Sequence, residues 1–133
     1  MPVEMLPLVL AGVGLVGFAY SISMAKRFAG KLVEYQYENH RDIWISDGRP
    51  PGEGESKKEV GFGNLSSIQA GGSLFWRWYQ ETPDWAIGDI NAVNLLARLR
   101  RWTIVAICGW ILGALGLVAV IFQTGVFDSF LGL

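Results

Sequence analysis

The sequence has little charge and a single cysteine. Charged residues make up 17% of the 133 residues, against about a quarter in an ordinary soluble domain. The lone Cys108 excludes an intrachain disulfide and a multi-cysteine metal cluster, and we interpret it as a small apolar side chain. The net charge of −1 favours neither nucleic acid nor a strongly acidic partner.

Two long stretches lack charge entirely. They are Met5–Met24 and Trp102–Phe122, 20 and 21 residues long. At about 1.5 Å per residue each forms roughly 30 Å of helix, the thickness of the bilayer's hydrocarbon core. Only a helix or a closed barrel satisfies the backbone in lipid, and uninterrupted apolar runs suit helices. The sequence therefore predicts two transmembrane helices.

Neither stretch contains Asp, Glu, Lys, Arg or His. Ionisable residues within a membrane mark proton relays, ion paths and substrate sites. Their absence argues against a transporter, a pump or a selective channel, and against haem or chlorophyll ligation by an imidazole within the spans.

Basic residues flank the two spans on the same side. The flanking residues are Lys26, Arg27, Lys31, Arg98, Arg100 and Arg101. Positive residues near span ends stay cytoplasmic, so both termini are expected in the periplasm. A cleaved signal peptide is the rival interpretation of the first stretch, but only Glu4 precedes it and the positive charges follow it.

The predicted fold is an all-α integral membrane hairpin with a cytoplasmic insert. The expected segments are an N-terminal span over residues 1–24, a cytoplasmic helical and loop segment over 25–101, a second span over 102–122, and a periplasmic tail over 123–133. The aromatic and leucine side chains of that tail predict that it folds back onto the outer surface or a partner.

The insert is expected to begin and end with helix. An amphipathic pattern over Ala25–Ser46 predicts that the first span continues beyond the membrane. Residues 47–72 contain seven glycines and predict a loop. Thr82 is expected to cap a turn that starts at Pro83, and Asp89 is expected to cap the long second helix.

Aromatic residues concentrate between these parts of the insert. They are Phe75, Trp76, Trp78, Tyr79 and Trp85. Trp and Tyr favour the membrane–water interface, so Ser73–Gln80 is interpreted as a short interfacial helix or re-entrant piece. A small aromatic core is the alternative. Nucleic-acid stacking would need a basic groove that the sequence lacks.

Motifs of catalysis and cofactor binding are not found. His40 lacks metal ligands at workable spacing and is expected at the surface, and Gly61-x-Gly63 lacks the third glycine of a dinucleotide fingerprint. No nucleophile motif occurs. We therefore expect no enzyme activity, no catalytic residues, no cofactor and no metal.

Small residues recur at helical spacing in both spans. In the second span they are Gly109 and Gly113, with Ala106 and Gly116 on the same face. In the first span they are Gly17 and Ser21, with Ala25 continuing that ladder and Gly12 and Gly14 preceding it. Such residues let helix backbones approach closely. These faces either pair the two spans or dock a partner's helix, although glycine is also simply common in membrane helices.

Several short motifs follow a familiar order. The first span ends in Met24-Ala25-Lys26-Arg27-Phe28, and Arg41-Asp42-Ile43-Trp44-Ile45-Ser46-Asp47-Gly48-Arg49-Pro50 follows. Later come Leu74-Phe75-Trp76-Arg77-Trp78, Gly88-Asp89-Ile90-Asn91 and Leu96-Ala97-Arg98-Leu99-Arg100-Arg101. This layout resembles the small two-span bacterial proteins grouped with universal stress protein B, in which a Trp-x-x-x-Gly-x-Pro stretch follows the first helix and an Asp-initiated, Arg-bearing helix enters the second span.

The resemblance implies an inner-membrane protein linked to stress tolerance, and it transfers no catalytic residue. The longer Gly-rich insert and the C-terminal tail depart from that pattern. The expected function is that of a non-enzymatic accessory or structural subunit of a larger inner-membrane complex of respiratory or photosynthetic type, packed through its helices. The alternative is a stress-tolerance protein acting alone or as a homo-oligomer. The expected partners are membrane lipids and integral membrane proteins.

Overall fold

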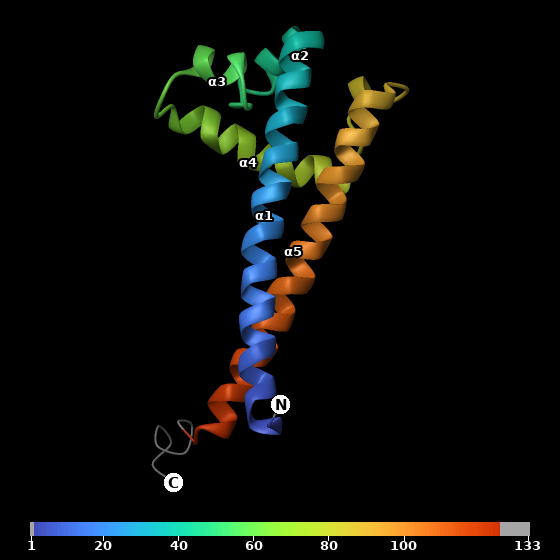
Figure 1. Ribbon diagram of the computed structural model, residues 1–133. Coiled ribbons are helices and arrows are strands. Elements are labelled where there is room, and N and C mark those ends of the chain that lie inside the picture. Colours follow the sequence, from blue (N-terminus) through green and yellow to red (C-terminus); the bar gives the residue numbers. More distant parts are fainter. Residues whose placement is uncertain (1, 126–133) are drawn as a thin grey trace. The chain divides into compact units, whose positions relative to one another are not determined.

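The chain folds into helices and turns. The computed structural model describes residues 2–125, and no strand occurs among them (Figure 1). The elements in order are η1 (Val3–Met5), α1 (Leu6–Asn39), α2 (Arg41–Ser46), α3 (Glu55–Val60), α4 (Leu65–Gln80), η2 (Asp84–Ala86) and α5 (Ile90–Gln123). The all-helical prediction is confirmed over this range. The expected fold-back of the tail lies, from residue 126 onward, outside the described residues.

Two compact units divide the described chain. One joins the residues up to Ser23 to those from Trp102 onward, and we call it the apolar unit. The other is Met24–Arg101, which we call the insert. Helices α1 and α5 each run through both units, because each is 34 residues long and has its apolar run in one unit and an amphipathic run in the other.

In the apolar unit, α1 and α5 are long and apolar enough to cross a membrane. Only 17% of the residues in each apolar window are buried, whereas the core helix of a soluble protein is buried on most sides. The two helices run antiparallel, since Ala11 lies by Gly116 and Gly14 lies by Gly113. The hairpin thus exposes most of its apolar side chains.

In the insert, the core forms where α1 and α5 continue as amphipathic helices. Ala25, Phe28 and Leu32 of α1 are buried, as are Leu96 and Leu99 of α5. Their spacing by three, four and seven residues places each set on one helix face. Burial of these apolar faces is the main force that stabilises such helices in water.

The helix expected over Ala25–Ser46 is interrupted. Helix α1 ends at Asn39, and α2 begins at Arg41. His40 has an extended φ of −139° and caps α2 without a side-chain hydrogen bond. The break lets Trp44 turn inward, where it is fully buried and its indole Nε1 donates to Pro50 O at 2.9 Å. The predicted end of this helix before Gly48, which has a φ of 90°, is confirmed.

The prediction of a loop over residues 47–72 is wrong at residues 55–60 and from residue 65 onward, where helices form. Helix α3 forms at Glu55–Val60, and α4 begins at Leu65, well before Ser73. The side chain of Asn64 caps α4 by accepting from Ser67 N. The glycines lower helix propensity, but burial of Ser67, Leu74 and Trp78 overrides it.

The structure also refines the approach to α5. Pro83, not Thr82, precedes the short η2 turn, and no side chain caps it. Thr82 Oγ1 instead accepts from Arg100 at 3.2 Å. The expected cap at Asp89 is confirmed, because its Oδ1 accepts from Asn91 N at 2.9 Å and from Ala92 N at 3.3 Å.

Candidate functional site

The small residues of the two spans meet within the apolar unit. A Cβ added to Gly14 would lie 2.6 Å from Gly113 Cα and 2.8 Å from Gly109 O. A Cβ added to Gly116 would lie 2.8 Å from Ala11 Cα. Backbone atoms occupy these positions, so no side chain fits there. Of the alternatives that the sequence left open, the structure places the glycine face of α5 against α1 of the same chain.

The contacting residues of α1 differ in part from those expected. Ser21 is buried, but a Cβ added to Gly17 would meet nothing within 4 Å. The tightest approach is made by Gly14 and Ala11. The backbone of Gly17 also lies against α5, because a Cβ added to Gly109 would lie 3.3 Å from Gly17 C. Gly17 and Ser21 were predicted from their spacing of four residues, which places them on one face of α1. Spacing does not show which face contacts α5, because that depends on where the second helix crosses the first.

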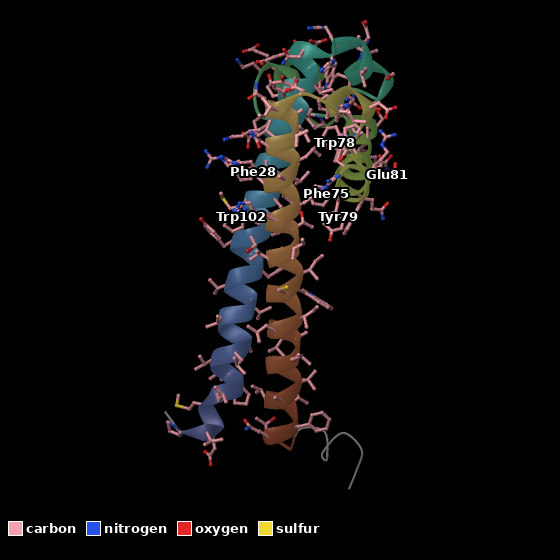
Figure 2. All side chains as sticks on the ribbon, turned by 90° about the vertical axis from the view of Figure 1, so that its right-hand side faces the viewer. Phe28, Phe75, Trp78, Tyr79, Glu81 and Trp102 are labelled. Atoms are coloured by element: carbon pink, nitrogen blue, oxygen red, sulfur yellow. The ribbon has the colours of Figure 1, made fainter. Side chains whose placement is uncertain are left out.

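The aromatic residues of the insert divide into two groups. Trp78 is 2% exposed, and its ring lies edge-to-face with Trp85 at 6.0 Å. Trp76 is 56% exposed, and Phe75 and Tyr79 are half-buried. Figure 2 shows Phe75 and Tyr79 together at one side of α4. The inner pair packs within the insert, as the aromatic-core alternative describes, while the outer three are more exposed.

The basic residues near the spans also differ from one another. Lys26, Arg27 and Arg101 are exposed. Lys31 Nζ and Arg98 Cζ lie over the ring of Phe28, at 5.5 and 5.8 Å from its centroid. Such cation–π contacts contribute about 0.5–1 kcal/mol at exposed positions.

Arg100 has a structural role that the sequence did not reveal. Its Nε and Nη2 donate to Trp78 O at 3.1 and 3.0 Å, and Nη2 also donates to Thr82 Oγ1. Trp78 lies in the last turn of α4, where carbonyls have no partner within the helix. Arg100 therefore joins α5 to the end of α4.

Glu34 of α1 organises the start of α3. Its carboxylate accepts from Gly54 N at 3.1 Å, from Ser56 N at 3.3 Å and from Ser56 Oγ. Partial burial raises the pKa of Glu34, but the hydrogen bonds from Ser56 and Gly54 outweigh it, so that the pKa lies below its ordinary value of 4.5. Sequence spacing gives no signal for this contact, because about twenty residues separate the partners.

Three further carboxylates hold elements of the insert together. Asp47 accepts from Gln36 Nε2 at 2.7 Å and pairs with Arg77 at 3.0 Å. Glu59 pairs with Arg41 at 2.6 Å. Asp89 accepts from the Tyr35 hydroxyl.

The electrostatics of Asp89 follow from these contacts. The hydrogen bond from Tyr35, aided by the backbone N–H groups of Ala92 and Asn91, holds the pKa of Asp89 below its ordinary value of 3.8. The carboxylate form is therefore favoured in the fold, which suits its role as the cap of α5.

A hollow of about 330 Å³ opens beside the end of α4. Its lining residues are Ile43, Asp47, Arg77, Trp78, Glu81, Thr82, Pro83, Asp84 and Trp85. Two of its polar groups, Asp47 and Arg77, pair with each other. Within residues 2–125, no cluster of three His, Cys, Asp or Glu side chains is placed to hold a metal ion.

His40 is less exposed than the sequence predicts. It is half-buried, and its ring lies 5.1 Å from that of Trp85. The break between α1 and α2 turns this side chain toward the η2 turn, which explains the difference from the expected surface position.

Comparisons of the chain with protein-family models, with curated proteins and with solved structures found no match.

Proposed function

We propose that this chain is a non-enzymatic accessory subunit of a larger complex in a bacterial inner membrane. The observation that carries the proposal is the closed contact between the small-residue faces of α1 and α5. Because Gly109 and Gly113 of α5 meet Gly14, and Gly116 meets Ala11, the hairpin is a paired unit that needs no second chain to cover the glycine face of α5. A preformed pair of spans is suited to filling space between larger subunits.

The outward surface of the hairpin supports docking in the membrane. A second set of small residues on α1, Gly12, Ala19 and Ser23, shares one helix face at steps of seven and four and is exposed. A Cβ added to Gly12 meets nothing within 4 Å. A partner's helix could approach α1 closely here, as small residues allow between membrane helices.

The insert supports a structural role over a catalytic one. Glu34, Asp47, Glu59 and Asp89 are all bound to other elements of the insert. Candidate catalytic carboxylates are recognised by a perturbed pKa together with access to a substrate. The carboxylates with a lowered pKa in this insert are those that cap helices or pair with neighbours.

The experiment is purification of the tagged full chain in a mild detergent, followed by mass determination and identification of the proteins recovered with it. We expect an integral membrane partner to accompany the natural chain. The double variant Gly12→Leu and Ala19→Leu should lose that partner, because leucine prevents close approach of helices. The control Val13→Leu, which enlarges an exposed neighbour of Gly12, should retain it.

Recovery as a homo-oligomer alone, or as a monomer with no partner, would contradict the accessory function. Either result would favour the alternative, a stress-tolerance protein that acts alone or as a homo-oligomer. In either case the internal glycine contact would stand, because it does not depend on a second chain.

A further inference from the structure

Helix α4 carries an apolar stripe that the insert leaves largely exposed. Leu65, Ile68, Gly72, Phe75, Trp76 and Tyr79 recur at steps of three and four, apart from the adjacent Phe75 and Trp76, and so form one side of the helix. Leu65 is 74% exposed and Ile68 54%. Ser66 and Ser73 flank the stripe on the polar side and are also exposed.

The opposite side of α4 is closed by the chain around α2. Ser67 Oγ donates to Gly48 O at 3.5 Å, and Arg77 pairs with Asp47. In Figure 1, α2 and α3 lie together on one side of α4. These elements follow Asn39, the end of α1 farthest from its apolar run. The open stripe therefore faces the end of the insert where Met24 and Arg101 lie.

The last turn of α4 is held at that same end. Arg100 binds Trp78 O, and only two residues of helix, about 3 Å of rise, separate Arg100 from Trp102, where the second apolar run begins. The last turn of α4 is therefore fixed to the part of α5 that carries the exposed Arg98 and Arg101. Helix α4 also carries Trp and Tyr, residue types that gather at membrane–water interfaces.

The charges nearby favour lipid over a second protein. Lys26, Arg27, Arg98 and Arg101 are exposed, and none makes an ion pair with a described residue. Lys31 differs, because it lines a hollow with Glu34 and Glu53. Clusters of Lys and Arg directly beside a membrane span attract anionic headgroups, so the four exposed cations complement a negatively charged bilayer surface.

We propose that α4 lies on the surface of an anionic bilayer, with its apolar stripe between the headgroups and the exposed cations against lipid phosphates. This inference rests on the proposed membrane anchorage of the chain. A helix with one apolar and one polar side is buried about 5–10 Å at the headgroup boundary, and Trp76 and Tyr79 keep their polar atoms near water there.

The test uses the full chain in lipid nanodiscs, in a Cys108→Ala background. A fluorescent label is attached at Ile68→Cys or Leu65→Cys on the stripe, and at Ser66→Cys or Ser73→Cys as matched controls on the exposed polar side. The membrane contains phosphatidylglycerol and phosphatidylcholine, with a nitroxide-labelled lipid as quencher. We expect the stripe labels to be quenched at least about threefold more than the controls, given the depth of such helices.

Equal and weak quenching at all four positions would overturn the proposal. If the stripe labels are accessible to water in nanodiscs but protected in a complex that co-purifies with the chain, a protein covers the stripe; this proposal then fails while the accessory function stands. If the chain does not enter nanodiscs at all, the membrane anchorage fails as well.

A second arm tests the role of the cations. In nanodiscs of phosphatidylcholine alone, the stripe labels should be quenched less, because the attraction of Lys and Arg for anionic lipid is lost. The double variant Arg98→Gln and Arg101→Gln should reduce the difference between the two membranes, because only Lys26 and Arg27 of the four exposed cations remain. If the natural chain is quenched equally in both membranes, the lipid charge does not contribute to the binding of α4. That result would overturn the proposed preference for an anionic bilayer.

Discussion

At the residue scale, Glu34 shows how one side chain can position a segment far away in the sequence. A six-residue helix such as α3 is too short to be stable alone. The carboxylate of Glu34 holds its first turn by binding two backbone N–H groups and the hydroxyl of Ser56. The start of α3 therefore depends on the charge state of a residue in α1.

We expect Glu34→Gln to loosen α3, because an amide is a weaker acceptor than a carboxylate. The pKa of Glu34 is lowered in the fold, so its contribution is present above the ordinary value of 4.5 and is lost as the pH falls below it. Hydrogen exchange of α3 measured as a function of pH checks this.

In the natural chain, protection of α3 should fall below that pH, whereas in Glu34→Gln it should be low throughout. The control Glu38→Gln changes an exposed glutamate in the same helix and should behave as the natural chain does. Unchanged protection in Glu34→Gln at neutral pH would show that the carboxylate does not hold α3.

Arg100 likewise has a role that depends on a distant segment. From the sequence it is one of six basic residues near the spans, and it predicts only the topology. The structure adds the bonds to Trp78 and Thr82, and hydrogen bonds of a charged donor contribute about 1.5–3 kcal/mol. Periodicity could not reveal this role, because the partners belong to different elements.

At the scale of elements, the pairing of α1 with α5 rests on backbone contact. In lipid the hydrophobic effect does not drive helices together, so close packing and weak hydrogen bonds must. Gly14 lies where the contact is tightest, since any Cβ there would overlap Gly113. Gly12, only two residues away, faces open space.

This difference predicts that Gly14→Ala weakens the hairpin by about 1–3 kcal/mol, the usual cost of overpacking. Gly12→Ala should not weaken it, because a Cβ there meets open space and alanine favours the helix over glycine. The measurement is unfolding of the purified chain in mixed micelles with increasing dodecyl sulfate, followed by energy transfer between labels on the two helices. Equal stability of the two variants would contradict the contact.

Helix α4 shows where propensity fails at this scale. The pair Gly71-Gly72, together with Gly61 and Gly63 before Leu65, predicts a loop. The helix forms because it buries Leu74 and Trp78 against the insert and is capped by Asn64. Tertiary burial outweighs the roughly 1 kcal/mol that each glycine costs in a helix.

At the scale of the whole molecule, the proposed topology places both ends of the chain in one compartment and the insert in the other. Three single-cysteine variants in a Cys108→Ala background test it: Val3→Cys, Phe62→Cys and Thr124→Cys, all at exposed positions. With a membrane-impermeant maleimide on intact spheroplasts, we expect labelling at residues 3 and 124, and at residue 62 only after lysis.

Labelling of only one end would contradict a hairpin. Recovery of the chain in the supernatant after membranes are sedimented would contradict membrane insertion altogether. Labelling of residue 62 alone on intact spheroplasts would place the insert outside the cytoplasm. The orientation would then be the reverse of the proposed one, while both spans would stand.

The sequence by itself determined the helical class, the two apolar runs, the cap at Asp89 and the end of α2 before Gly48. These features are local: they depend on the length of an uncharged run, on periodicity and on capping chemistry within a few residues. A single sequence therefore reveals them.

Only the tertiary structure decided which glycines meet, which tryptophan is buried and which carboxylate holds which helix. It placed the tightest contact with α5 at Gly14, turned Trp78 inward and Trp76 outward, and assigned Glu34 to the start of α3. The physical reason is that each of these outcomes depends on contacts between segments far apart in the chain. Helical periodicity orders the faces of one helix, but the neighbouring helix decides which of those faces is covered.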